Sequence, residues 1–289
     1  MNSLTRKLVL AVITVVLTVV ALGSTTFAWF TLSNRAVIEN FDVSVTTDVG
    51  IEFAIGAEAE PLANLTFRTT LTSADILAYI EDTYGPTFAF SHVTSPDGEN
   101  FYELGGVGTT TGYLSLPIHF RSNSSNLINW YSVDLFTTDS SYTTATTFVD
   151  SKGVTRNSGS SFTVNTADAI RISMIGDSII AYENPVSATN TVLGLLTNAD
   201  LTTANGAVDF YQAVTSLDPA GVADVSVVET QTAIANDFIL TLAADPLNDY
   251  GQAFHGTLRI NIWFEGWDAE GYNSLLGRAV TIGFEFRAA

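Results

Sequence analysis

Alternation of apolar and polar residues is the feature that most constrains the fold of this chain. In residues 114–121, Leu, Leu, Ile and Phe alternate with Ser, Pro, His and Arg. Successive side chains of a β-strand point to opposite faces of a sheet, so a period of two predicts a strand with one apolar and one polar face. The same alternation occurs at 41–45, 170–174, 257–264 and 280–287.

Strands of this kind predict an all-β fold. Antiparallel sheets commonly leave one face in water, and each apolar face must be covered by another layer. We therefore expect an antiparallel β-sandwich. Pro117 cannot donate a hydrogen bond to a neighbouring strand, which places it at a sheet edge or at a bulge.

The expected helices are short and few. The pair Thr72-Ser73 can cap a helix over residues 74–82, which Gly85 would end. Asp268 can cap a second short helix, over residues 268–276. Both lie in insertions between strands.

The N-terminus has the three parts of a secretory signal peptide. Arg6 and Lys7 give a basic start, and residues 8–22 are apolar apart from two threonines. Thr26-Phe27-Ala28 then supplies a small-x-Ala cleavage site. The pattern predicts a hydrophobic signal helix within residues 1–28, export of the chain, and cleavage between Ala28 and Trp29.

Composition excludes several functions. Residues 1–28 contain two of the 11 basic residues and none of the 30 acidic ones, so the mature charge is 9 − 30 = −21. A surface this acidic repels phosphate backbones, which excludes nucleic acid as a partner. The chain has no cysteine, so a disulfide, a thiolate zinc site and a cysteine nucleophile are excluded as well. No repeat or Pro-rich linker divides residues 29–289, which we expect to form a single domain.

One short motif raises the question of catalysis. Gly176-Asp177-Ser178-Ile179 resembles the nucleophile block of GDSL-type hydrolases, a family that supplies its histidine base from a late Asp-x-x-His. Here Gln252 stands three residues before His255, so that spacing is absent. A turn between strands that end at Ile175 and resume at Ile179 explains the motif, and a secreted hydrolase is kept as an alternative. We expect no catalytic residue and no enzyme.

Metal binding has little support in the sequence. The three histidines lie far apart, and His119 is expected on the solvated face of its strand. Acidic clusters at 97–100, 245–249 and 265–270 could supply oxygen ligands for calcium, although none has the spacing of an EF-hand loop. Acidic turn residues are the favoured interpretation, so we assign no cofactor and leave calcium open.

A membrane-anchored surface protein is the main alternative to a secreted one. Residues 8–30 are long enough to span a bilayer, so they could be an uncleaved signal anchor. Trp263 and Trp267 could stack on a sugar if they were exposed, although such residues more often cover a sheet edge. An adhesin or carbohydrate-binding module is therefore the second hypothesis.

The segment after the predicted cleavage site is apolar and prone to form a strand. Trp29-Phe30-Thr31-Leu32 opens the mature chain, which continues through residue 40 to the strand at 41–45. Such a terminus must pack on its own domain, stay in the membrane or pair with another copy. Pairing would be β-augmentation, in which an extended segment adds a strand to a neighbour's sheet edge. Repeated head to tail without closing, this contact builds a filament.

The same junction resembles a known family. Gly23, Thr26, Ala28 and Phe30 form a Gly-x-x-Thr-x-Ala-aromatic-Phe run. This run is similar to that of the TasA/camelysin family of Gram-positive bacteria, whose precursors carry signals of the SipW-processed type. The segment 262–268 also looks like one near the C-terminus of related surface proteins of Firmicutes and their wall-less relatives.

The resemblance implies a jelly-roll β-sandwich, export, and assembly into extracellular or biofilm fibres. It also implies that residues 29–40 are donated as a strand to the next subunit. At 41–45 the sequence Phe-Asp-Val-Ser-Val replaces the family's Phe-x-x-Gly-x-Leu pattern. Camelysin is classed as a metallopeptidase, but no zinc-binding motif is visible in this chain, so that activity is not transferred.

Together these patterns predict a secreted structural protein of the cell surface that assembles into fibres or biofilm matrix. The expected self-assembly residues are Trp29, Phe30 and Leu32. The expected partners are further copies of the chain and the cell envelope. The membrane would be a partner only through residues 8–30, if that segment is uncleaved.

Overall fold

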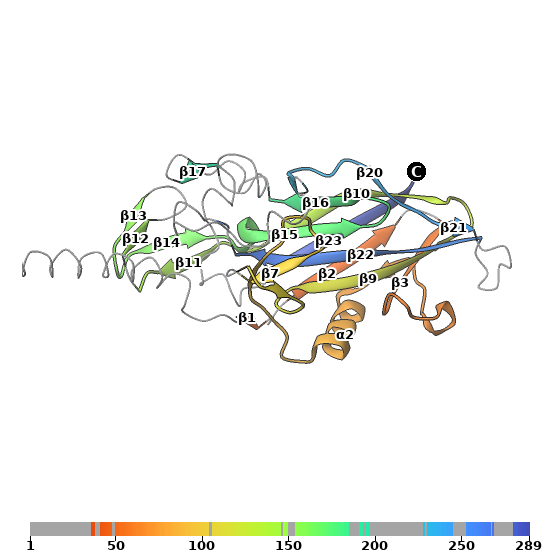
Figure 1. Cartoon of the computed structure of the whole chain (residues 1–289), viewed down its shortest axis with the longest axis horizontal. Helices are drawn as coiled ribbons and strands as arrows, with labels where there is room; N and C mark the ends of the chain where they lie inside the picture. Colours follow the sequence, from red (N-terminus) through yellow and green to blue (C-terminus); the bar gives the residue numbers. More distant parts are fainter. Residues whose placement is uncertain are drawn as a thin grey trace, which may run out of the picture.

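The computed structural model confirms that the fold is all-β (Figure 1). It describes residues 36–37, 41–47, 50–103, 106–145, 147–149, 154–184, 191–192, 195–196, 228, 230–244, 253–266, 268 and 280–289. Within these ranges the only helices are one α-helix and two 3-10 helices, Leu62–Asn64 and Thr166–Ala169. The predicted signal helix lies outside them.

One layer is a five-stranded sheet. In spatial order its strands are β20 (Asp237–Thr241), β10 (Leu127–Phe136), β23 (Val280–Ala288), β2 (Phe41–Thr47) and β4 (Thr70–Leu71). The strands predicted at 41–45 and 280–287 are therefore confirmed. β2 runs parallel to β23, although we expected antiparallel pairs throughout. The two strands come from opposite ends of the chain, so no hairpin fixes their relative direction.

The other layer is a ten-stranded sheet arranged around one long strand, β22. Its members are β22 (Phe254–Glu265), β9 (Leu114–Ser122), β6 (His92–Thr94), β21 (Ala243–Ala244), β15 (Ile170–Ile175), β3 (Ile51–Ile55), β16 (Ile179–Glu183), β19 (Thr230–Gln231), β7 (Phe101–Glu103) and β8 (Gly108–Thr109). Along one edge of β22 lie β9 and then β6, and along the other lie β21 and then β15. β3 extends the sheet beyond β9, β16 and β19 extend it beyond β15, and β7 and β8 extend it beyond β6.

Within the described ranges, short strands form four additional two-stranded sheets. They are β1 (Ala36–Val37) with β5 (Ala89–Phe90), β11 (Ser140–Thr143) with β14 (Ser161–Val164), β12 (Phe148–Val149) with β13 (Thr155–Arg156), and β17 (Thr191–Val192) with β18 (Leu195–Leu196). The β11–β14 and β12–β13 pairs follow one another in a narrow ribbon that extends beyond the two large sheets (Figure 1).

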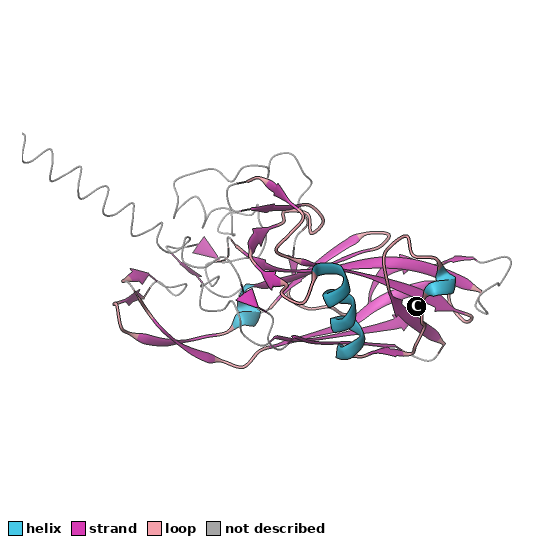
Figure 2. Cartoon of the chain, turned by 90° about the horizontal axis from the view of Figure 1, so that it is seen from below, coloured by secondary structure: helices cyan, strands magenta, loops and turns pink. Residues whose placement is uncertain are grey.

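The predicted helix after Thr72 is confirmed as α2 (Ser73–Tyr84). Thr72 is its N-cap, and Thr72 and Asp75 form a reciprocal capping box. Gly85 ends the helix with a φ of +86°, a left-handed conformation that favours glycine. The helix packs against β2 and β3 and crosses the strands steeply (Figure 2). Most of the second predicted helix, 268–276, lies outside the described residues.

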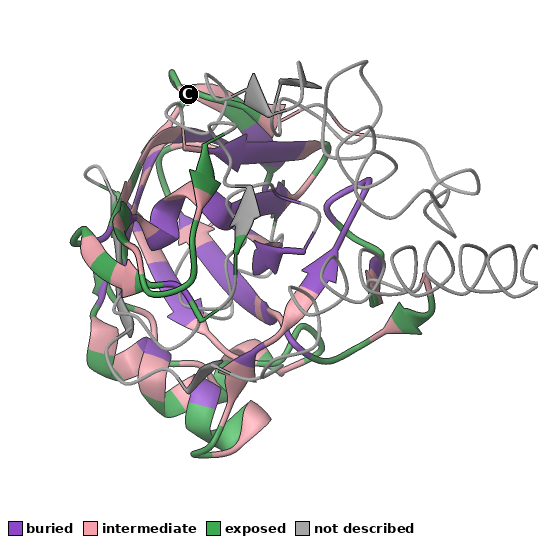
Figure 3. Ribbon diagram, turned by 90° about the vertical axis from the view of Figure 1, so that its left-hand side faces the viewer, coloured by how far each residue is buried: buried purple, intermediate pink, exposed green. Residues whose placement is uncertain are grey.

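The two large sheets face each other across a shared core, as a sandwich requires. Phe53 of β3 and Phe120 of β9 meet Phe286 of β23, with ring centroids 5.8 and 5.1 Å apart. At another point Trp130 of β10 meets Tyr182 of β16, at 6.5 Å. Viewed along the molecule, buried segments line the inside of both layers (Figure 3). Burial of these aromatic and aliphatic side chains is the main stabilising contribution.

The prediction that every strand has one solvated face is wrong for the centre of the larger sheet. Arg171, Ser173 and Asn261 occupy expected polar positions on β15 and β22, yet all three are buried. The loop between β6 and β7 lies against this face and hydrogen-bonds to Ser173 and Asn261. A third layer thus covers part of the sheet.

Pro117 occupies an edge only locally. β9 is an interior strand over residues 118–122, where it pairs with β3, and its ladder with β22 runs without a register shift. The pairing with β3 ends at Ile118, so Pro117 lies just beyond it. The N–H and carbonyl of Ser115, two residues away, bond to the Tyr84 hydroxyl rather than to a strand. Pro117 therefore needs no ladder partner on that side.

Candidate functional site

The predicted assembly residues lie outside the described part of the chain. This holds for Trp29, Phe30 and Leu32, for the cleavage site after Ala28, and for the apolar stretch 8–30. In the part that is described, no helix is both long enough and apolar enough to cross a membrane.

The described chain begins with the end of the expected donor segment. Ala36 and Val37, which form β1, pair antiparallel with Phe90 and Ala89 of β5 in the same chain. We call this pair of strands the entry ladder. β2 then takes its place between β23 and β4. The whole of 29–40 was expected as a donor strand, but its residues 36–37 pair within their own chain.

β5, the strand with which β1 pairs, is linked to α2 and β9 by aromatic contacts and hydrogen bonds. The rings of Tyr84, Phe88 and Phe90 contact one another in sequence, with centroids 5.2 and 5.4 Å apart. The Tyr84 hydroxyl donates to the carbonyl of Ser115 at 2.8 Å and accepts from its N–H at 2.9 Å. Burial raises the pKa of Tyr84 to about 12, so the hydroxyl stays protonated and can donate. α2, β5 and β9 are thereby joined beside the entry ladder.

The acidic cluster 97–100 organises its own loop. Asp97 is buried, and its Oδ1 accepts from the N–H groups of Glu99 and Asn100 at 2.9 and 2.7 Å. Its Oδ2 accepts from the Asn100 side chain at 2.6 Å, and Ser95 donates to Oδ1 at 3.3 Å. The carboxylate is engaged by donors, which agrees with the interpretation as an acidic turn residue.

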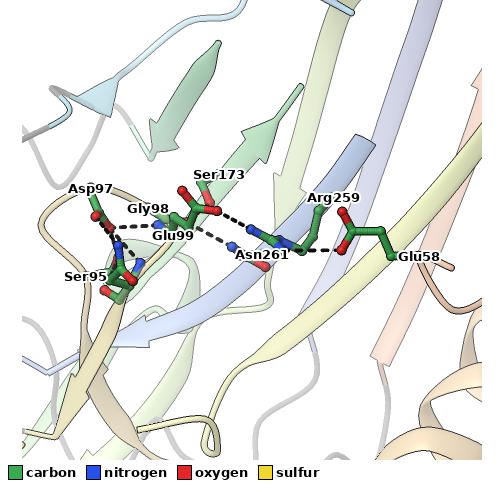
Figure 4. A network of polar contacts seen from close by, with 9 residues as sticks. Glu58, Ser95, Asp97, Gly98, Glu99, Ser173, Arg259 and Asn261 are labelled. Carbon is green, nitrogen blue, oxygen red and sulfur yellow. Dashed lines mark hydrogen bonds and ion pairs between the residues drawn. The ribbon is translucent and has the colours of Figure 1, made fainter. Parts of the chain in front are cut away.

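Two contacts fix this loop on the outer face of the larger sheet (Figure 4). The carbonyl of Gly98 accepts from Ser173 at 2.5 Å and from Asn261 at 2.9 Å. Gly98 has a φ of +74°, and a Cβ there would lie 2.8 Å from the Ser173 Cβ, so the approach requires glycine. Arg259 then pairs with Glu99 at 2.5 Å and with Glu58 at 3.5 Å.

A buried ionic cluster lies on the same sheet. Arg171 Nη2 is 2.9 Å from a Glu183 oxygen and 2.8 Å from an Asp268 oxygen, and all three side chains are buried. Burial alone would lower the pKa of Arg171, but Glu183, Asp268 and Glu265 outweigh it and raise that pKa. The guanidinium therefore stays charged.

In the described part of the chain, the predicted metal ligands are not gathered into a metal site. Among the described residues, no group of three or more His, Asp or Glu side chains could hold a metal ion. His119 is buried rather than solvated, so that prediction is wrong. Its Nε2 lies 3.0 Å from the carbonyl of Ala57 and its Nδ1 2.9 Å from the Thr257 hydroxyl. The cluster 245–249 lies outside the described residues.

The Gly176-Asp177-Ser178 motif is the turn of the β15–β16 hairpin, which confirms its interpretation as a turn between two strands. Ser178 is exposed at this turn. The N–H of Gly176 donates to the carbonyl of Ser178 at 3.0 Å and closes the turn. Asp177 makes contacts outside the hairpin, and these were not expected from the sequence.

Trp263 is not available to stack on a sugar. It is buried against Val93 and Phe101, and its indole N–H donates to Glu265 at 2.9 Å. The suggestion that it could be exposed is therefore wrong, because β6 and β7 cover its side of β22. Trp267 lies outside the described residues.

No family model, no curated protein and no solved structure matches this chain. The similarity to the TasA/camelysin family therefore rests on the sequence motifs described above.

Proposed function

We propose that this chain is a secreted structural protein that assembles into extracellular fibres through its mature N-terminus. The observation that carries the proposal is the apolar run Trp29-Phe30-Thr31-Leu32 directly after the predicted cleavage site. The entry ladder, in which Ala36 and Val37 pair with β5 of the same chain, follows that run and limits a donated strand to the residues before Ala36. A second copy could take up this run as an added strand without removing β1 or β2 from the donor.

The proposal has three further parts. Residues 1–28 act as a signal peptide that is cleaved after Ala28, the two sheets are connected as a jelly roll, and the fibres attach to the cell envelope. Support comes from the signal pattern, from the two-layer all-β architecture, and from an acidic composition suited to a soluble exported chain.

Burial of aromatic side chains would supply the driving force. Each aromatic side chain buries about 150–250 Å², and burial contributes about 25 cal/mol per Å². Trp29 and Phe30 would therefore contribute several kcal/mol at each junction. Main-chain hydrogen bonds of the added strand would fix its direction and register.

The test replaces Trp29, Phe30 and Leu32 by Ser in the exported chain. We expect a folded monomer that no longer forms filaments, because the added strand loses its apolar side chains. Thr31→Ser is the matched control and should leave the filaments unchanged. Electron microscopy and near-UV circular dichroism provide the two readouts. Filaments formed equally well by the triple variant would rule out the proposal.

N-terminal mass spectrometry separates this proposal from the anchored alternative. A peptide that begins at Trp29 is expected for a secreted fibre protein. A mature chain that still carries residues 8–30 would instead favour an adhesin held at the membrane.

A further inference from the structure

Among the residues that the structure describes, β20 is a terminal strand of the five-stranded sheet, with β10 on one side only. Its sequence Asp-Phe-Ile-Leu-Thr is apolar at the centre, and Phe238 is 44% exposed. A terminal strand presents N–H and carbonyl groups that can pair with the strand of another molecule. β20 is therefore a place where two copies could join unless its outer edge is blocked.

A bulge interrupts β20 at its midpoint. Leu240 pairs with Ile128 and Phe238 pairs with Asn129, so Ile239 has no partner position on β10. Ile239 and Leu240 are consequently both buried, where regular alternation would expose one of them. Bulges bend and twist a strand, which makes an edge less suitable for pairing.

The outer edge of β20 is occupied at the same point by the β15–β16 turn. The N–H of Asp177 donates to the carbonyl of Ile239 at 2.8 Å. One carboxylate oxygen of Asp177 accepts from the N–H of Thr241 at 3.0 Å. A single residue thus supplies one donor and one acceptor to groups two positions apart, as a residue of a parallel strand would.

Gly176 permits this close approach. A Cβ at position 176 would lie 2.2 Å from the carbonyl oxygen of Ile239, a distance that no real contact allows. The neighbouring Ser178 is exposed. The glycine and the aspartate of this turn therefore both serve its contact with β20.

We propose that Gly176 and Asp177 form an edge cap that prevents β20 from pairing with β20 of a second copy. Without the cap, two identical edges could meet antiparallel about a two-fold axis and continue the sheet across both molecules. The cap would direct any association of the chain away from this edge. The proposal does not depend on the N-terminal fibre contact.

The test uses the full chain as it is isolated from the cells that express it, with Asp177→Ala as the variant. The N–H of Thr241 loses its acceptor, so its hydrogen exchange should become at least tenfold faster. Phe238→Cys in the same chain provides the only thiol, because the sequence contains no cysteine. A short bis-maleimide should then cross-link two copies of the chain that carries both Asp177→Ala and Phe238→Cys. It should not cross-link the chain that carries Phe238→Cys alone. Ser178→Ala is the matched control and should behave as the parent.

Two results would overturn the edge cap. One is an Asp177→Ala chain with a native near-UV spectrum and no more cross-linking than Ser178→Ala. The other needs no variant. In the parent chain the Thr241 amide is expected to exchange its hydrogen as slowly as the Leu240 amide. Rapid exchange of the Thr241 amide would show that the edge of β20 is open and would overturn the proposal. Neither readout involves Trp29 or Phe30, so failure of the fibre proposal would leave both results interpretable.

Discussion

Arg171 and Arg68 show how burial determines the contribution of an ion pair to stability. Arg171 is buried beside Glu183 and Asp268, where only these carboxylates offset the cost of removing the guanidinium from water. Arg68 pairs with Asp75 at 2.5 Å, but 49% of the Arg68 side chain is exposed. Solvent screens a pair of that kind, which contributes little to stability.

Replacing Arg171 by Met should therefore be strongly destabilising. The buried carboxylates lose their guanidinium, and we expect the free energy of unfolding at pH 7 to fall by about 3–5 kcal/mol. Arg68→Met is the control, with an expected loss of about 1 kcal/mol or less. Urea unfolding followed by tryptophan fluorescence measures both values. Equal losses would mean that burial does not distinguish the two sites.

At the scale of elements, α2 depends on its first turn. Thr72 accepts from the N–H of Asp75, and an Asp75 oxygen accepts from the N–H of Thr72 at 2.9 Å. The backbone hydrogen bond from Thr72 is the largest cause of a lowered pKa for Asp75, to which the Thr72 hydroxyl and Arg68 also contribute, while partial burial opposes it. The ionised carboxylate is thus the form that caps the helix.

Stability should consequently depend on the charge of Asp75. Its pKa in the folded chain is lower than the ordinary 3.8, so its contribution is complete above pH 3.8 and is lost as the pH falls through the lower value. Thr72→Ala should cost about 1 kcal/mol at pH 7. Asp75→Asn should lower the free energy of unfolding at pH 7. In this variant the further decrease of that free energy below pH 3.8 should be smaller than in the parent chain. Asp82→Asn, on the exposed part of the same helix, is the control in urea unfolding at pH 7 and pH 3. An unchanged acid profile in Asp75→Asn would contradict the capping role.

For the whole molecule, the position of β2 divides the N-terminal region in two. β2 lies between β23 and β4, so the five-stranded sheet includes a strand from each end of the chain. The entry ladder precedes it, and in the described part of the chain it pairs through Ala36 and Val37. Residues before Ala36 are therefore expected to be dispensable for the fold, whereas β2 is not.

Two truncations test this division. A chain that begins at Ala36 should keep its near-UV spectrum and its cooperative urea transition. A chain that begins at residue 48 lacks β2, exposes one edge of β23, and should not fold. Size-exclusion chromatography and circular dichroism measure the outcome. A native spectrum from the shorter chain would show that β2 is not part of the stable sheet.

Features set by neighbours in the sequence could be predicted. The helix after Thr72, its end at Gly85 and the turn between Ile175 and Ile179 all follow from local rules of capping and turn formation. The alternating strands and the all-β class follow from a period of two, because that period fixes which side chains share a face.

Only the tertiary structure decided what covers each face. Asn261 and Trp263 stand at polar-face positions of β22, yet the loop and strands from residues 92–103 bury both. The partner of Asp177 is likewise a strand more than 60 residues away. Periodicity along one strand reports the two faces of that strand, whereas the covering segments come from distant parts of the chain and leave no mark on its local pattern.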